Sequence, residues 1–137
     1  MAGGNSARDL GVPLVHYLRK TVALADFSNV PAGQLGVSLG AIPAGAFLGQ
    51  LFARIDTPFN AGTTNVLTVG FDNNVTNMAS AADITEGSAQ TQVISTGAGL
   101  QPTVDSDIYV KYAQTGTPAN AGQATFVVSF VPLRPSS

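Results

Sequence analysis

Few side chains in this sequence could carry acid–base or nucleophilic chemistry, and they lie far apart. His16 is the single histidine, and the chain has no cysteine. Any Ser-His-Asp triad would have to include His16, and we predict no nucleophile elbow around any serine. Asp83 and Glu86 lie three residues apart, a spacing better explained by an exposed polar loop than by glycoside hydrolysis. The sequence therefore predicts a protein without catalytic residues.

Two turns carry enough oxygen atoms to be considered as calcium sites. Asp105 and Asp107 are two residues apart, so in an extended segment their carboxylates would share one face. Asp72-Asn73-Asn74 is the second such turn. Calcium takes about six or more oxygen ligands, and neither turn supplies that number alone. We therefore expect both turns to be capped by these side chains, with no bound metal and no cofactor.

The composition indicates a protein that acts through a surface. The chain has 137 residues, enough for one domain with its own core. Only 10% of the residues are charged and 45% are hydrophobic, with a formal net charge of −2, whereas an average domain is about 25% charged. Such a chain would be poorly soluble as a bare monomer, which predicts oligomerisation or assembly. The six lysines and arginines are scattered apart from Arg19-Lys20, so nucleic acid is not an expected partner.

The sequence gives no sign of export or of membrane insertion. The first nine residues lack the basic start and apolar run of a signal peptide. The longest uncharged stretch, 27–53, is interrupted by Gly and Pro turns and polar residues, so it does not reach the roughly 18 apolar residues of a membrane helix. We therefore expect no membrane partner, and the absence of cysteine excludes a disulfide scaffold.

Short alternating segments separated by Gly, Pro and Asn turns predict an all-β fold. The expected architecture is an antiparallel β-sandwich or jelly roll of about seven to eight strands. It comprises an extended N-terminal arm at 1–17, a β-sandwich domain at 18–133 and a C-terminal tail at 134–137. A short helix at 78–82 and a helix within 47–57 remain alternatives. The expected strands are 19–27, 34–42, 47–57, 65–71, 90–95, 107–113 and 123–133.

Two of these segments make specific predictions about which faces are buried. In 47–57, alternation places Phe47, Leu51 and Ile55 on one face. In 123–133, apolar residues occupy both faces, which indicates either a central strand or a strand covered by a partner. The triplet Asn-Ala-Gly occurs at 60–62 and again at 120–122, and we interpret it as repeated turn chemistry because the flanking strands do not match.

Five motifs of turn and strand residues follow one another along the chain. They are Ile-Pro-Ala-Gly-Ala at 42–46, Phe-Asn-Ala-Gly-Thr-Thr-Asn-Val-Leu-Thr-Val-Gly at 59–70, Ala-Asp-Ile-Thr at 82–85, Asp-Ile-Tyr-Val-Lys-Tyr at 107–112 and Thr-Gly-Thr-Pro-Ala-Asn-Ala-Gly-Gln-Ala-Thr-Phe-Val-Val at 115–128. Their order resembles that of small structural proteins of tailed bacteriophages that decorate or cement the capsid exterior. The resemblance implies a jelly-roll protein without catalytic residues, a homotrimer that binds the major capsid protein at symmetric positions on the head. It also implies synthesis in the host cytoplasm and a final location on the outside of the virion.

Two functions follow as hypotheses. The first is a decoration protein that bridges capsid subunits and attaches through an apolar patch at the end of the arm, made of Val12, Leu14, Val15, His16 and Tyr17. Deletion of residues 1–16 should then leave a folded domain that attaches weakly. The alternative is a head-fibre or tail-associated β domain that binds host-surface glycan through long loops at 58–64, 72–88, 96–104 and 114–122, gathered at one end of the sandwich.

Overall fold

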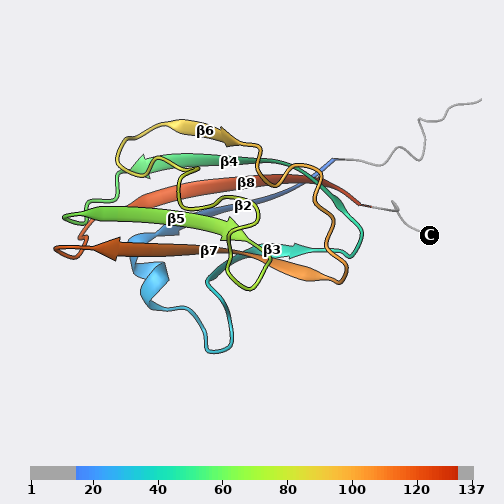
Figure 1. Cartoon of the computed structure of the whole chain (residues 1–137), viewed down its shortest axis with the longest axis horizontal. Coiled ribbons are helices and arrows are strands. Elements are labelled where there is room, and N and C mark those ends of the chain that lie inside the picture. The colour runs from blue at the N-terminus through green and yellow to red at the C-terminus, as the bar shows by residue number, and fades with distance from the viewer. Residues whose placement is uncertain (1–14, 133–137) are drawn as a thin grey trace, which may run out of the picture.

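The computed structural model describes residues 15–132. Within this range, seven strands and one 3-10 helix follow one another along the chain (Figure 1). No helix of the described range is long and apolar enough to cross a bilayer. The elements are β2 (His16–Ala23), η1 (Leu24–Ser28), β3 (Val37–Ile42), β4 (Phe47–Thr57), β5 (Thr64–Gly70), β6 (Thr91–Ile94), β7 (Ser106–Thr115) and β8 (Gln123–Val131).

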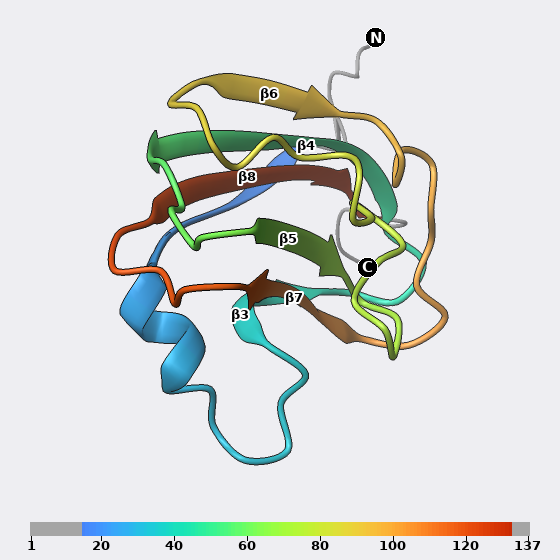
Figure 2. The ribbon, with the colours of Figure 1, turned by 60° about the vertical axis from the view of Figure 1, so that its left-hand side comes forward.

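The strands form two antiparallel sheets with the topology of a jelly roll. One sheet has the order β2-β8-β4-β6 and the other the order β3-β7-β5. Successive strands along the chain therefore alternate between the two sheets. The two sheets pack face to face (Figure 2). A β-bridge between Val69 and Ala79 adds an edge segment beside β5. The prediction of an all-β sandwich or jelly roll is confirmed.

The core lies between the two sheets and is built by alternation. In β8, Ala124, Phe126 and Val128 are buried while the residues between them are half-buried. In the other sheet Leu67 and Ile108 are fully buried. Burying such side chains supplies about 25 cal/mol for each Å² of apolar surface removed from water, so the alternating pattern holds the sheets together.

Strand β4 has the predicted bounds, but its face assignment is partly wrong. The pairing with β8 shifts between Leu48 and Leu51, which indicates a β-bulge. A bulge adds one residue to one strand and reverses the alternation beyond it. Leu48 is consequently buried and Phe47 is 46% exposed, although the alternation predicted that Phe47 would share the buried face of Leu51 and Ile55.

The first strand begins earlier than predicted and the second begins later. β2 starts at His16 and runs antiparallel to β8, so His16 and Tyr17 belong to the sandwich and not to the arm, because their backbone pairs with that of β8. The predicted strand 19–27 ends in η1, and Asp26 accepts a hydrogen bond from the Ala23 amide at 2.8 Å. Arm residues 1–14 lie outside the described residues.

The segment 71–90 contains no helix among the described residues, which excludes the alternative at 78–82. A compact loop opens it, in which Asp72 accepts hydrogen bonds from the Thr76 amide at 2.7 Å and the Asn77 amide at 3.1 Å. Val75 sits in this loop with φ = 58° and is fully buried. The loop therefore directs the chain beside β5, where Ala79 makes its bridge.

The loops divide between the two ends of the sandwich (Figure 1). At one end, the Gly62 amide donates a hydrogen bond to the Thr117 carbonyl at 2.8 Å, joining the β4–β5 and β7–β8 loops. At the other end, the Gly45 amide donates to the Pro102 carbonyl at 2.8 Å, joining the β3–β4 and β6–β7 loops. The prediction that loops 58–64, 72–88, 96–104 and 114–122 gather at one end is therefore wrong. Loops 58–64 and 114–122 meet at one end, whereas loop 96–104 lies at the other end.

Candidate interaction surface

Several large apolar side chains gather on the outer face of the four-stranded sheet. Because alternate residues point to opposite faces, the residues between the core positions point outward from β2, β8, β4 and β6. Three of them are large and well exposed: Tyr17 at 63%, Phe47 at 46% and Val93 at 53%. Val15, directly before β2, is 52% exposed. With their half-buried neighbours they form the outer apolar surface, which comprises Val15, Tyr17, Phe47, Phe52, Val93, Val127 and Val131.

Strand register arranges most of these side chains in two rows. Val93 of β6 pairs with Phe52 of β4, which pairs with Val127 of β8. At the end of the sheet where β2 begins, Phe47 pairs with Val131. Cross-strand partners have side chains within contact distance on a common face. Val127 pairs with Arg19 of β2 and Tyr17 pairs with Ser129, so polar side chains lie among the apolar rows.

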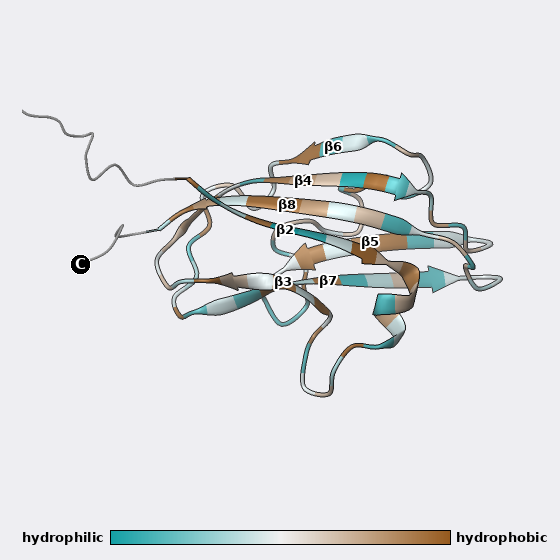
Figure 3. Cartoon of the chain, turned by 180° about the vertical axis from the view of Figure 1, so that it is seen from behind, coloured by the Kyte–Doolittle hydropathy of each residue, from teal (hydrophilic) through white to brown (hydrophobic). Residues whose placement is uncertain are grey.

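The surface has a polar boundary at its opposite end. Thr125 of β8 donates a hydrogen bond to Asp56 at 2.7 Å and shares another with Thr21 at 2.9 Å. Arg54 forms an ion pair with Asp56 at 3.2 Å. Figure 3 shows the change from hydrophobic to hydrophilic colour along β8 and β4. An apolar area with a polar rim is the usual anatomy of a protein–protein interface.

The outer face of the three-stranded sheet has a different character. Its central strand β7 presents Asp107, Tyr109 and Lys111, and Thr68 of β5 pairs beside Lys111. The Tyr109 hydroxyl donates a hydrogen bond to Asp107 at 3.3 Å, and the burial of Tyr109 together with the charge of Asp107 raises the pKa of that phenol. The outer face of the three-stranded sheet is thus more polar than the outer face of the four-stranded sheet.

The predicted attachment patch is divided by the structure. Val15 and Tyr17 point outward and belong to the outer apolar surface. His16 lies on the opposite side of β2 and is exposed, and its ring stacks on Phe130 with 5.5 Å between centroids. Val12 and Leu14 lie outside the described residues. The apolar pattern on both faces of 123–133 was the sequence signal for Val127 and Val131. β8 is a central strand, and these two residues stay half-exposed on its outer face.

The carboxylates considered as calcium ligands accept hydrogen bonds from protein groups. Asp105 accepts a hydrogen bond from the Ala44 amide at 2.9 Å, and Asp107 accepts one from Tyr109. Asp72 is partly desolvated, which raises its pKa, but the hydrogen bonds from Thr76 and Asn77 outweigh this and lower its pKa overall. Across residues 15–132, no three His, Cys, Asp or Glu side chains come together as metal ligands would.

The Gly-x-Ser-x-Gly spacing of a nucleophile elbow is present at 36–40, contrary to the prediction that no serine is so placed. Ser38 nevertheless lies within β3, whereas an elbow places its serine at a sharp turn from strand to helix. Its hydroxyl accepts a hydrogen bond from the Gly40 amide at 3.2 Å. His16 packs on Phe130, so the described residues assemble no triad around Ser38.

The fold is similar to that of chains in two bacteriophage capsid structures. One is the cyanophage Pam1 capsid asymmetric unit, with a TM-score of 0.66 and 20% identity over 96% of this chain and 99% of that chain. The other is the acidic stable capsid structure of Helicobacter pylori bacteriophage KHP30, with a TM-score of 0.61 and 15% identity over 90% of each chain. No protein-family model matches the sequence, and no curated protein matches it.

Coverage is nearly complete in both directions. The matched Pam1 chain is therefore close in length to this one and consists of the same jelly roll without a further large domain. At these identities the likeness concerns the fold alone, because one fold hosts many functions.

Proposed function

We propose that this protein is a structural component of a tailed-phage virion that decorates the outside of the head and stabilises it by bridging major capsid protein subunits. The observation that carries the proposal is the outer apolar surface, which one face of the sandwich has and the other lacks. A patch of exposed Tyr, Phe and Val side chains loses the unfavourable contact with water when a partner covers it.

Three features support this function. The fold is similar to that of chains in two phage capsid structures. The turn motifs resemble those of capsid decoration proteins. The charged fraction of 10% and the net charge of −2 suit a protein that works within an assembly. Many identical weak contacts repeated on a symmetric shell add up to strong attachment.

Self-association belongs to the same proposal, as a homotrimer with one part of the surface against a neighbouring copy and another against the capsid. The chain provides a matched pair of variants to test the surface. Tyr17→Ser with Val93→Thr removes two exposed apolar side chains from the outer apolar surface. Tyr109→Ser with Val66→Thr makes the same changes on the outer face of the three-stranded sheet.

The experiment mixes particles that lack the protein with wild type or either double variant, then measures co-sedimentation and maps the bound protein by cryo-electron microscopy. We expect wild type and Y109S/V66T to occupy symmetric positions on the head, and Y17S/V93T to bind at least about tenfold more weakly. Sedimentation velocity of each variant without particles tells self-association from capsid binding. Density confined to the tail, or equal binding by both variants, would overturn the proposal.

A further inference from the structure

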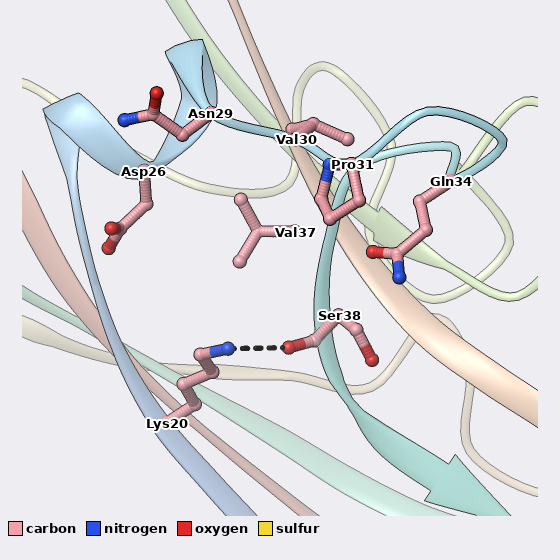
Figure 4. A pocket seen from close by; sticks show the side chains of 8 residues that line it. All are labelled: Lys20, Asp26, Asn29, Val30, Pro31, Gln34, Val37 and Ser38. Carbon is pink, nitrogen blue, oxygen red and sulfur yellow. Dashed lines mark hydrogen bonds between the residues drawn. The ribbon is translucent and has the colours of Figure 1, made fainter.

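A polar cleft of about 350 Å³ lies between β2, η1, the loop 29–36 and β3. Its floor is Val37, which is 8% exposed. Figure 4 shows the Asp26 carboxylate on one side of Val37 and the Gln34 amide on the other, with the Lys20 ammonium below. Val30 and Pro31 provide further apolar wall. The cleft thus surrounds a small apolar floor with groups that form hydrogen bonds.

The hydrogen bonds within the protein use only part of this capacity. Lys20 donates one hydrogen bond to the Ser38 carbonyl at 3.0 Å, and an ammonium has three donors. Asp26 accepts the Ala23 amide through Oδ2, so Oδ1 remains for a ligand. Asn29 donates from Nδ2 to the Ala25 carbonyl at 2.9 Å, which leaves its Oδ1 as an acceptor. The hydrogen-bonding groups that remain for a ligand therefore include both donors and acceptors.

The charges of the cleft select against ionic ligands. Lys20 and Asp26 are its two charged groups, and they are of opposite sign. A phosphate or sulfate would be attracted by Lys20 but repelled by Asp26, and a cation would meet the reverse. A neutral molecule whose hydroxyls both donate and accept would satisfy both groups, while its C–H face could rest on Val37 and Pro31.

From this geometry we infer that the cleft binds a neutral sugar residue. Asp26 accepts a hydrogen bond from one hydroxyl, Lys20 donates to another, and Gln34 provides an amide that does either. The loop 29–36 that lines the cleft projects from the sandwich between η1 and β3 (Figures 1 and 2). The outer apolar surface lies on the face of the four-stranded sheet, so a partner bound there would leave the cleft open. Sugar binding is thus a second function, independent of the proposed attachment to a head.

The test uses the full chain in solution without particles, so its outcome does not depend on the decoration function. Saturation-transfer NMR is recorded with free glucose, galactose, mannose and N-acetylglucosamine, followed by titration of the sugar that responds. We expect binding near the millimolar range typical of a single small site, weakened at least about tenfold in Asp26→Asn with Gln34→Ala.

Matched controls are Asp105→Asn and Gln90→Ala, which change the same residue types outside the cleft. Both controls should bind like wild type. Absence of saturation transfer from all four sugars to the wild-type protein would overturn the inference. Binding that is equally strong in D26N/Q34A, with the fold intact by circular dichroism, would overturn it as well, because the sugar would then sit elsewhere.

Discussion

Asn60 and Asn120 are joined by reciprocal hydrogen bonds although 60 residues separate them along the chain. The Asn60 amide Nδ2 donates to Asn120 Oδ1 at 2.7 Å. In return, Asn60 Oδ1 accepts the backbone amides of Asn120 at 2.9 Å and Ala121 at 3.1 Å. The two repeated Asn-Ala-Gly triplets thus meet, and they tie the β4–β5 loop to the β7–β8 loop.

Asn60→Ala should destabilise the fold measurably. It removes one donor and one acceptor that together make three contacts, and a net intramolecular hydrogen bond contributes about 0.5–1.5 kcal/mol. We expect a loss of about 1–2 kcal/mol in the free energy of unfolding, measured by urea denaturation. Asn73→Ala changes an exposed turn asparagine and should stay within about 0.5 kcal/mol of wild type. An equal loss of stability in the two variants would contradict the conclusion that the Asn60 hydrogen bonds stabilise the contact between the two loops.

Gly122 should be intolerant of any side chain. A Cβ at this position would meet the Phe59 ring, with the closest atoms well inside van der Waals contact. That ring packs against Tyr112 at 4.9 Å and Phe27 at 6.3 Å between centroids, so it has little room to move. Overpacking of this kind costs about 1–3 kcal/mol, and Gly122→Ala should lose that much stability.

Gly87→Ala is the matched control for this overpacking. No atom lies within 4 Å of a Cβ built at Gly87, so the control should be neutral or slightly stabilising through reduced chain entropy. Both variants would be compared with wild type in the same urea titration. A Gly122→Ala variant as stable as Gly87→Ala would show that the aromatic group at this end of the sandwich is loosely packed.

Glu86 should make the fold less stable as the pH rises. It is 8% exposed, and its carboxylate accepts a hydrogen bond from the Leu67 amide at 2.7 Å. Burial raises the pKa of Glu86 above the ordinary value of 4.5, and the hydrogen bond from Leu67 compensates only in part. The folded chain therefore holds this proton more tightly than the unfolded chain. Stability contributed by Glu86 is present below pH 4.5 and is lost as the pH rises toward the folded pKa.

Glu86→Gln isolates this effect, because glutamine keeps an oxygen for the Leu67 amide and does not ionise. Relative to wild type, the variant should gain stability as the pH rises from 4 to 7, measured as the urea midpoint at each pH. Asp83 gives the opposite control: hydrogen bonds from Ser80 and Thr96 lower its pKa below 3.8. The contribution of Asp83 is thus lost only as the pH falls below 3.8. Parallel midpoint curves for E86Q and wild type would contradict the prediction.

Truncation of the N-terminus should now stop before β2. Deletion of residues 1–14 leaves every described pair of β2 and β8 in place, whereas deletion of 1–16 would remove the pairing and stacking of His16 with Phe130. We expect the shorter deletion to keep the thermal midpoint and to weaken attachment to particles. A shorter deletion that unfolds would show that residues 1–14 are part of the fold, and unchanged attachment would remove them from the interface.

The sequence allowed the all-β class and the approximate position of each strand to be predicted. Those positions follow from alternation and from Gly, Pro and Asn turns, which act over a few residues. The bulge in β4 could not be predicted, because the shift between Leu48 and Leu51 depends on how β4 pairs with β8. The division of loops between the two ends likewise depends on topology, which no local pattern encodes.

The candidate surface was predicted only in part for the same reason. Val15 and Tyr17 stood out as an apolar patch, but Phe47 and Val93 join them only through cross-strand neighbours from β4, β6 and β8. Val127 and Val131 gave the best local signal, since they make β8 apolar on its outer face as well as its inner face. Glu86 was assigned to an exposed loop, and the structure buries its carboxylate against β5, where it accepts the hydrogen bond from the Leu67 amide.

The place of β8 in its sheet has a consequence for how the protein is made. β8 lies between β2 and β4, and β2 has no other strand partner in the described structure. Of the described strands the ribosome synthesises β8 last, so β2 has no strand partner until the other six strands have been made. Non-local pairing of this kind folds slowly and exposes apolar surface meanwhile. A chain whose translation stops before Gln123 cannot complete the four-stranded sheet, so only copies that contain β8 can adopt this fold.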